Sequence, residues 1–144
     1  MFVLLLVCTV LDPSLTYRTL YLQIPGFSSY LHAIEIDQEQ LMLGIGQHVD
    51  PNSGRRVGVK ISLFDINNPK NPMEIGNFTD EDAYSNAQHD FKSFRYLPLS
   101  QKLILPKREY TYSAEGNFDG FVVYDVSLTG ITPSHESKFQ YLVQ

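Results

Sequence analysis

The sequence predicts an all-β domain built from short antiparallel strands. Nine Tyr, nine Phe and many Val and Ile residues are spread along the chain, and aromatic and β-branched residues favour strands. Turn-forming residues interrupt the chain about every dozen residues, and no long segment follows the 3.6-residue period of a helix. With 144 residues and a hydrophobic fraction of 43%, the chain can build one domain with its own core.

Apolar runs and alternating patterns locate the individual strands. In the segment 57–64, the odd-numbered residues are apolar and share one face, whereas Lys60 and Ser62 point to the other. The strands predicted in this way are Leu20–Ile24, Tyr30–Ile36, Gln40–Ile45, Val57–Phe64, Glu74–Phe78, Ser93–Leu97, Lys102–Pro106 and Gly120–Val126.

Polar segments separate these strands. Ile36–Gln40 and Leu99–Lys102 are polar tips between apolar runs, as hairpins require. Asp65–Pro72 contains two prolines and three asparagines. Because Pro cannot donate to a strand ladder and Asn tolerates positive φ, this segment is predicted to leave the sheet. The segments 51–54 and 114–117 are further loops of this kind.

Two stretches of the chain, 32–65 and 92–125, repeat one pattern at an offset of 60 to 62 residues. Each contains a strand, a polar tip, a second strand, a loop and a third strand that ends in an aromatic–Asp pair. These pairs are Phe64-Asp65 and Tyr124-Asp125. With a final exit strand, each unit has the four antiparallel strands of a propeller blade. The sequence therefore predicts a partial β-propeller made of four-stranded antiparallel blades.

Several segments also resemble a known family, in the same order and at similar spacing. The chain is similar to secreted, bacterial-type beta propeller domain proteins, which are distantly related to WD-40 repeats. The resemblance implies a propeller exposed outside the cytoplasm, and it brings no established catalytic residues. Since the family members are several times longer, the chain corresponds to about two blades and part of a third. The matching segments are Ile24–His32, with Ala33 in place of a following Pro, Leu41–Gly46, Gly58–Glu74, Tyr84–Phe94 and Gly120–Val126.

The N-terminal segment differs from the rest of the chain. Residues 1–19 match the family poorly, and residues 20–144 form the partial propeller domain. The apolar stretch Met1–Val10 leaves two interpretations open: a β-strand, or a signal-like stretch without a preceding Lys or Arg. It is too short to span a bilayer, which takes about 20 residues. Cys8 is the single cysteine, which excludes an internal disulfide, and we expect a buried, inert thiol.

Charge and motifs limit the function classes. The formal net charge is −5, so a nucleic acid is a poor partner because phosphate binding needs a positive surface. The sequence has no G-x-S-x-G, Walker or dinucleotide-binding motif. We therefore predict no catalytic residue within the chain. The family resemblance implies an extracellular or cell-surface location.

Aromatic and histidine residues are the candidates for ligand contact. Tyr110, Tyr112 and Phe118 lie in the long loop before a third strand, where propellers present variable residues. Packing in the core or between blades is the alternative for these three residues. His32 and His89 are further candidates, with His32 expected to hydrogen-bond an adjacent blade. The four histidines show no close pair at metal-ligand spacing, so each is more typical of a satisfied polar group.

The acidic segment 80–82 could hold a calcium ion. Asp80, Glu81 and Asp82 offer the oxygen ligands that Ca²⁺ prefers, but they lack the D-x-D-x-D-G spacing of an established calcium loop. A solvated acidic turn is the alternative, and no other cofactor is expected. Asp65 and Asp125 end equivalent strands, and we expect them to accept backbone N–H bonds at the turns.

The leading functional hypothesis is a non-catalytic propeller section that presents loops to a protein or glycan and packs against the remaining blades of a longer propeller. An alternative is part of a propeller enzyme, such as a hydrolase, a lyase or a metal-dependent enzyme, whose site needs the missing blades. A third possibility is a piece without independent function, because open sheet edges favour aggregation.

Overall fold

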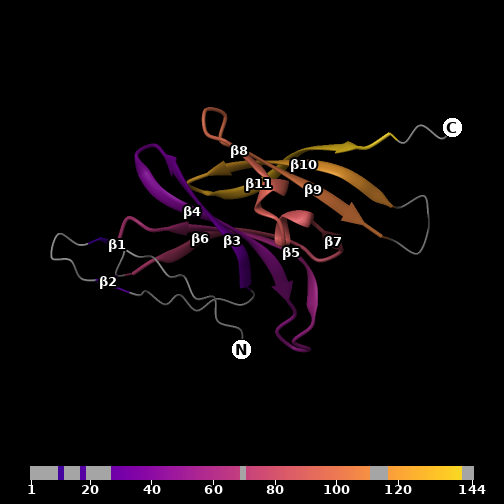
Figure 1. The fold of residues 1–144 in the computed structure, drawn as a ribbon, viewed down its shortest axis with the longest axis horizontal. Coiled ribbons are helices and arrows are strands. Elements are labelled where there is room, and N and C mark those ends of the chain that lie inside the picture. The colour runs from indigo at the N-terminus through magenta and orange to yellow at the C-terminus, as the bar shows by residue number, and fades with distance from the viewer. Residues whose placement is uncertain (1–9, 12–16, 19–26, 69–70, 111–116, 141–144) are drawn as a thin grey trace.

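The described part of the computed structural model is all-β and covers residues 10–11, 17–18, 27–68, 71–110 and 117–140. It contains two large antiparallel sheets, together with a small pairing of β1 (Val10–Leu11) and β2 (Tyr17–Arg18) (Figure 1). Cys8, Tyr112 and the predicted strand Leu20–Ile24 lie outside the described residues. The predicted fold class is confirmed.

The first sheet has four strands in chain order. They are β3 (Phe27–Ile36), β4 (Glu39–Val49), β5 (Arg56–Asp65) and β6 (Met73–Asp80). The tip between β3 and β4 has positive φ at both Asp37 and Gln38, as in a type I′ hairpin turn. The four strands predicted here lie within these elements, and the predicted loop 51–54 lies between β4 and β5. Asp65–Pro72 leaves the sheet as expected.

The second sheet repeats this order with one change. Its strands are β7 (Ala83–Tyr84), β8 (Arg95–Leu97), β9 (Lys102–Glu109), β10 (Phe118–Ser127) and β11 (Gly130–Lys138). Both β7 and β8 pair with β9, where the first sheet has β3 alone. The 3₁₀ turns η1 (Asn86–Gln88) and η2 (Phe91–Ser93) lie between β7 and β8. The predicted strand Ser93–Leu97 is thus shortened to β8, because Ser93 belongs to a turn.

Strand β11 is an edge strand with a polar sequence. It pairs only with β10 among the described strands, and most of its side chains are exposed. Pro133 is tolerated there because an edge strand has one side without ladder bonds. The register shifts next to Val123, and the Ser134 hydroxyl donates to the Val123 carbonyl oxygen over 3.2 Å. An apolar pattern could not have located this strand.

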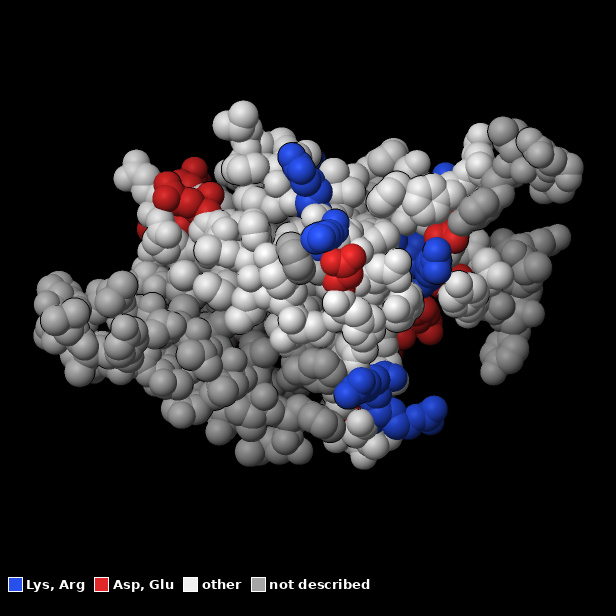
Figure 2. All heavy atoms as spheres, in the orientation of Figure 1, with Lys and Arg blue, Asp and Glu red and all other residues white. Residues whose placement is uncertain are grey.

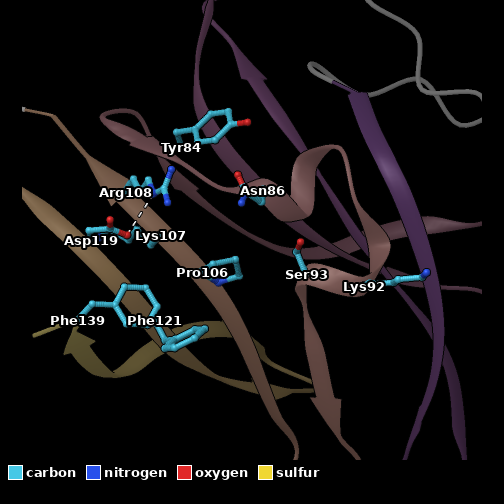
Figure 3. Close-up of a pocket in the computed structure, with 10 residues that line it drawn as sticks. All are labelled: Tyr84, Asn86, Lys92, Ser93, Pro106, Lys107, Arg108, Asp119, Phe121 and Phe139. Carbon is cyan, nitrogen blue, oxygen red and sulfur yellow. Dashed lines mark hydrogen bonds and ion pairs between the residues drawn. The ribbon is translucent and has the colours of Figure 1, made fainter. Parts of the chain in front are cut away.

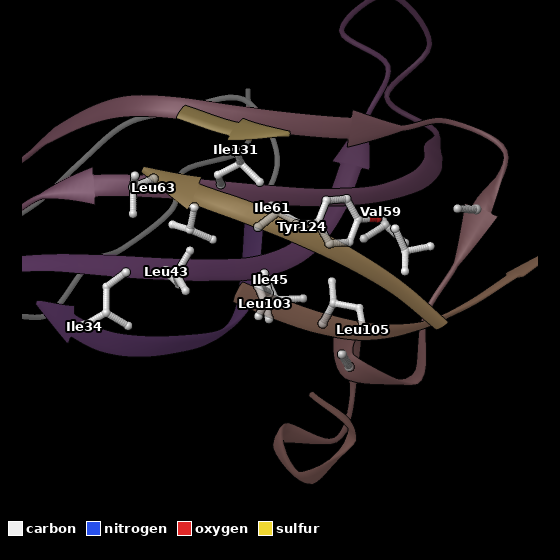
Figure 4. Packing of buried hydrophobic residues seen from close by; sticks show 14 of the residues in the cluster. Ile34, Leu43, Ile45, Val59, Ile61, Leu63, Leu103, Leu105, Tyr124 and Ile131 are labelled. Carbon is white, nitrogen blue, oxygen red and sulfur yellow. The ribbon is translucent and has the colours of Figure 1, made fainter. Parts of the chain in front are cut away.

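The hydrophobic core lies between the two sheets (Figure 4). Inward-facing residues of β4 and β5 meet those of β9 and β10, with Ile34 and Ile131 at the margins. The fully buried side chains of this core include Leu43, Ile45, Ile61, Leu63 and Leu103.

Matching backbone bonds show which positions of the two sheets correspond. The Ile66 N–H donates to the Gln40 carbonyl oxygen, and the Val126 N–H donates to that of Gln101. Val126 therefore stands at the position of Ile66, sixty residues further on, as the two aromatic–Asp pairs also require. In the second strands, Gln101 stands at the position of Gln40.

Corresponding residues of the two sheets point to opposite sides of the shared core. Ile61 faces the core and is fully buried, whereas its counterpart Phe121 faces away from the core and is 41% exposed. Conversely, Tyr124 faces the core, whereas its counterpart Phe64 is buried outside this cluster. A symmetric sandwich would bring equivalent faces together. The two sheets instead stack head to tail, as successive blades of a propeller do.

Candidate functional site

A short turn of the second sheet is inserted against the first sheet. Ser85 caps η1, and its hydroxyl accepts a hydrogen bond from the Ala87 N–H over 3.2 Å. The Gln88 side-chain oxygen accepts from the Ser85 N–H over 3.2 Å, which completes a capping box. Both side chains are buried, and the capping box satisfies the Ser85 hydroxyl and the Gln88 side-chain oxygen within the turn itself.

Gln88 connects the two sheets directly. Its Nε2 donates to the Gly46 carbonyl oxygen over 3.2 Å and to the Gly58 carbonyl oxygen over 3.0 Å. These carbonyls belong to β4 and β5, next to the register shift between Gln47 and Val49. All the polar atoms of the Gln88 amide are thus engaged, and the side chain is only 2% exposed. We refer to this arrangement as the Gln88 clasp.

A second connection between the sheets is the charge cluster around Lys107. Its Nζ lies 2.9 Å from Asp80 of β6, 2.5 Å from Glu109 of β9 and 3.1 Å from Glu136 of β11. Burial opposes the charge on Lys107, but the hydrogen bonds with Glu109, Asp80 and Glu136 outweigh burial and raise the pKa of Lys107 above its ordinary value. Lys107 therefore keeps its charge and holds three strands together.

A cleft of about 380 Å³ opens beside the second sheet (Figure 3). Tyr84 and Asn86 line one side, and Pro106, Arg108 and Phe121 line the other. Phe121 lies on the side of the sheet that faces away from the core. The cleft therefore opens on the side of the second sheet that no other described sheet covers.

The cleft combines charged and aromatic groups. The Arg108 Nε donates to Asp119 over 3.1 Å across β9 and β10. Phe121 and Phe139 meet edge to face with their ring centroids 4.8 Å apart, and both rings are partly exposed. Such a surface can receive a segment that is partly apolar and partly able to hydrogen-bond.

Tyr110 and Phe118 have opposite environments. Tyr110 is 72% exposed at the end of β9. Phe118 is buried in the core cluster, with the Nζ atoms of Lys107 and Lys138 at 5.3 and 5.7 Å from its ring centroid. The Phe118 ring therefore packs and does not face solvent. The third aromatic candidate, Tyr112, is outside the described residues.

The two histidine candidates lie apart from each other. His32 of β3 is partly buried in a ring cluster, with centroids at 5.4 Å from Phe94 and 6.3 Å from Tyr96 of the second sheet. Its contacts with the adjacent sheet are thus ring contacts. His89 is exposed and lies 6.0 Å from the Tyr84 ring, near the cleft.

The acidic segment 80–82 does not converge on one point. Asp80 is half-buried against Lys107, and Glu81 approaches the His48 Nε2 at 4.0 Å. Asp82 is exposed. Among the described residues, no three His, Cys, Asp or Glu side chains are grouped so that they could hold a metal ion. Calcium binding at this segment stays a prediction.

The two repeated aspartates have different roles. The Asp65 carboxylate accepts from the Asn67 N–H over 2.9 Å and from its side-chain amide over 2.8 Å, which confirms the predicted turn contact. Asp125 instead pairs with the Lys102 ammonium and accepts from the Ser134 hydroxyl over 3.3 Å. Both repeats therefore place an aspartate near the end of the third strand, but the two aspartates have different interaction partners.

Basic residues form no single patch on the face of the molecule shown in Figure 2. On the face shown in Figure 2, Lys and Arg lie in small separate groups among mostly uncharged atoms. No helix in the described part of the chain is long and apolar enough to cross a bilayer.

Sequence reasoning missed Gln88 and Lys107 as contact residues between the sheets. The spacing Ser85-x-x-Gln88 is a capping-box signature and could have indicated the turn. Nothing local indicates the partners of Gln88, because they lie 42 and 30 residues away along the chain.

Two uncharacterized archaeal proteins are similar in sequence to part of this chain. One relative is an uncharacterized protein of Methanocaldococcus jannaschii, 33% identical over 91 residues that cover 63% of this chain and 13% of the relative. Another is an uncharacterized protein of Archaeoglobus fulgidus, 36% identical over 73 residues that cover 51% of this chain and 10% of the relative. The chain thus matches only a small part of the length of these relatives. No solved structure matches it.

The family described as Beta propeller domain matches residues 5–140, beginning well before Leu20, where the resemblance in the sequence starts. This match includes both stacked sheets, the Gln88 clasp and the Lys107 cluster. The chain belongs to the Beta propeller domain family.

Proposed function

We propose that this chain is a non-catalytic section of an extracellular β-propeller that serves as a binding scaffold for a protein or a glycan. The observation that carries the proposal is the use of its buried polar side chains. Gln88 and Lys107, which lie where the two blades meet, are fully engaged in holding the blades together. These residues stabilise a rigid support, and recognition is left to exposed residues at its rim.

Tyr110 is the described residue best suited to recognition. Its ring is largely exposed directly after β9, a strand whose apolar side chains are anchored in the core. A tyrosine offers a flat apolar ring and a hydroxyl, which suit both a sugar face and a peptide surface. A tyrosine side chain has few rotatable bonds, so little conformational entropy is lost when a ligand binds.

Binding to an array of glycans and extracellular proteins tests the proposal. The chain is expected to bind a ligand, and Tyr110→Ala is expected to weaken that binding by about tenfold, the loss typical of one aromatic contact. Leu99→Ala is the matched control, because Leu99 is fully exposed at a different loop tip. Binding that is equally strong in both variants would remove Tyr110 from the site.

A second candidate function is part of an enzyme whose site needs further blades. The favouring observation is the buried Tyr96 hydroxyl, which has no hydrogen-bond partner among the described residues and lies beside His32. These residues come from the first-strand positions of two blades, and first strands line the channel of a propeller. Elemental analysis of the purified chain distinguishes the candidates. A stoichiometric metal that is lost in His32→Ala favours the enzyme. A Ca²⁺ that is lost in Asp82→Asn supports calcium binding by the acidic segment 80–82.

A further inference from the structure

We infer that the cleft beside Phe121 is the seat for the entering turn of a following blade, a further copy of the same repeat in a longer chain. This inference rests on the proposed function, in which the chain is one section of a larger propeller. It deepens that proposal by naming the face and the cavity that receive the next blade.

The first blade carries an equivalent site, which is occupied by a turn of the second blade. The turn η1 of the second blade lies against β4, and Gln88 donates to the carbonyl oxygens of Gly46 and Gly58. On the same face of the first blade, Ile61 is fully buried. One blade therefore supplies the face, and the next blade supplies the turn.

The cleft lies at the corresponding place on the second blade. The register of β4 and β9 makes Lys107 the counterpart of Gly46, and the register of β5 and β10 makes Phe118 the counterpart of Gly58. Lys107 itself lines the cleft together with its neighbours Pro106 and Arg108, and so does Asp119, the residue after Phe118. The site that the turn η1 occupies on the first blade therefore corresponds to the open cleft on the second blade.

The uncovered face agrees with this assignment. Phe121, the counterpart of the buried Ile61, remains 41% exposed and pairs with the partly exposed Phe139. Because blades stack head to tail, the face that is covered on the first blade is the face that is open on the second. The matched segments also cover only 13% and 10% of the two archaeal relatives, which leaves ample length for further repeats.

The chemistry of the two seats differs in one respect. β4 and β5 pair with a register shift near Gly46, whereas β9 and β10 pair without one. At the cleft, an entering turn therefore meets the side chains of Arg108 and Asp119 in place of main-chain carbonyls at a shift. An amide side chain such as that of Gln88 suits this pair, because it can accept from a guanidinium and donate to a carboxylate.

An extended chain tests the inference. A second copy of residues 81–140 is appended directly after residue 140, which corresponds to residue 80 in the sixty-residue repeat. This copy carries the turn and the core-facing side that pack on the first blade. Phe121→Cys in the original copy reports on the open face through its rate of thiol labelling, and peptide mass spectrometry separates this label from Cys8. Leu99→Cys at an exposed tip is the matched control.

The labelling rate at position 121 is expected to fall at least about tenfold in the extended chain, because labelling then needs local opening, while the rate at position 99 stays within about twofold. Changing the glutamine of the appended turn to alanine, the equivalent of Gln88→Ala, should restore most of the rate. Equal rates at position 121 in the original and extended chains would overturn the inference. Protection that is unchanged by the glutamine substitution would overturn the assignment of the turn to the cleft. Neither result affects ligand binding through Tyr110, which tests the proposed function separately.

Discussion

The Gln88 Nε2 lies 3.0 Å from the carbonyl oxygen of Gly58, so a side chain of the second blade is hydrogen-bonded to the main chain of the first. The same nitrogen reaches the Gly46 carbonyl oxygen on the neighbouring strand. A buried amide that satisfies two carbonyls replaces water that the closed interface excludes. The clasp therefore couples the folding of the two blades.

Gln88→Ala is expected to lower the free energy of unfolding by about 2 to 4 kcal/mol. The substitution removes the Gln88 hydrogen bonds to two carbonyls and to the Ser85 N–H, and a buried group left unpaired costs about 1 to 3 kcal/mol before the site relaxes. Urea unfolding of the chain measures this loss. Gln140→Ala, at an exposed position, serves as the control and should change stability by less than about 0.5 kcal/mol. Similar midpoints for the two variants would contradict the role of the clasp.

Stability is expected to fall as the pH rises above about 10. Burial raises the pKa of Tyr124, and the carboxylates around Lys107 raise the pKa of its ammonium despite burial. Both groups hold their protons more tightly in the folded state than in the unfolded state. Above their ordinary values of 10.0 and 10.5, the unfolded chain therefore loses protons first, and unfolding becomes easier.

Each of these two groups contributes a slope of up to about 1.4 kcal/mol per pH unit. Unfolding midpoints between pH 8 and pH 11.5 measure the total slope. Tyr124→Phe should remove the contribution of Tyr124 to this slope, because phenylalanine does not titrate. A slope that is the same in Tyr124→Phe as in the parent chain would show that Tyr124 ionises alike in both states.

Gly76→Ala is expected to destabilise the contact between the outer strands of the two blades. A Cβ atom at Gly76 would lie 2.8 Å from the Gly130 Cα, and main chain cannot move aside as a flexible side chain can. Forcing β6 and β11 apart should cost about 1 to 3 kcal/mol of unfolding free energy. Asn77→Ala on the same strand, where the side chain is exposed, should cost far less. Equal losses in thermal or urea unfolding would speak against the close approach.

Phe118→Ala and Tyr110→Ala should separate packing from recognition. Truncation of the buried Phe118 should cost about 3 to 5 kcal/mol, because it leaves a cavity in the core. Truncation of the exposed Tyr110 should change stability by less than about 0.5 kcal/mol. Urea unfolding of both variants checks this difference. A large loss of unfolding free energy in Tyr110→Ala would mean that the Tyr110 ring packs against the protein and is not available to contact a ligand.

Much of the fold could be predicted from local sequence. Alternation in the segment 57–64 and the polar tip at residues 36–40 specify strands and a hairpin, because side chains alternate between the faces of a sheet. The aromatic–Asp pairs located the repeat. The polar edge strand β11 was missed, because its exposed side chains need no apolar pattern.

The relation between the two sheets could not be predicted in the same way. Within the predicted offset of 60 to 62 residues, the value of 62 matches Gln40 to Lys102, whereas the observed bonds make Gln101 the counterpart of Gln40. A slip of one residue reverses which face of a strand is buried. Only the assembled sheets show that Ile61 is covered while Phe121 is open.

Local pattern in this chain thus determined the strands, the turns and the repeat, because these depend on neighbours within a few residues. Tertiary structure decided the head-to-tail stacking, the partners of Gln88 and Lys107, and the uncovered cleft. Those features join residues that are distant along the chain, and their formation depends on the register and direction in which whole sheets pack.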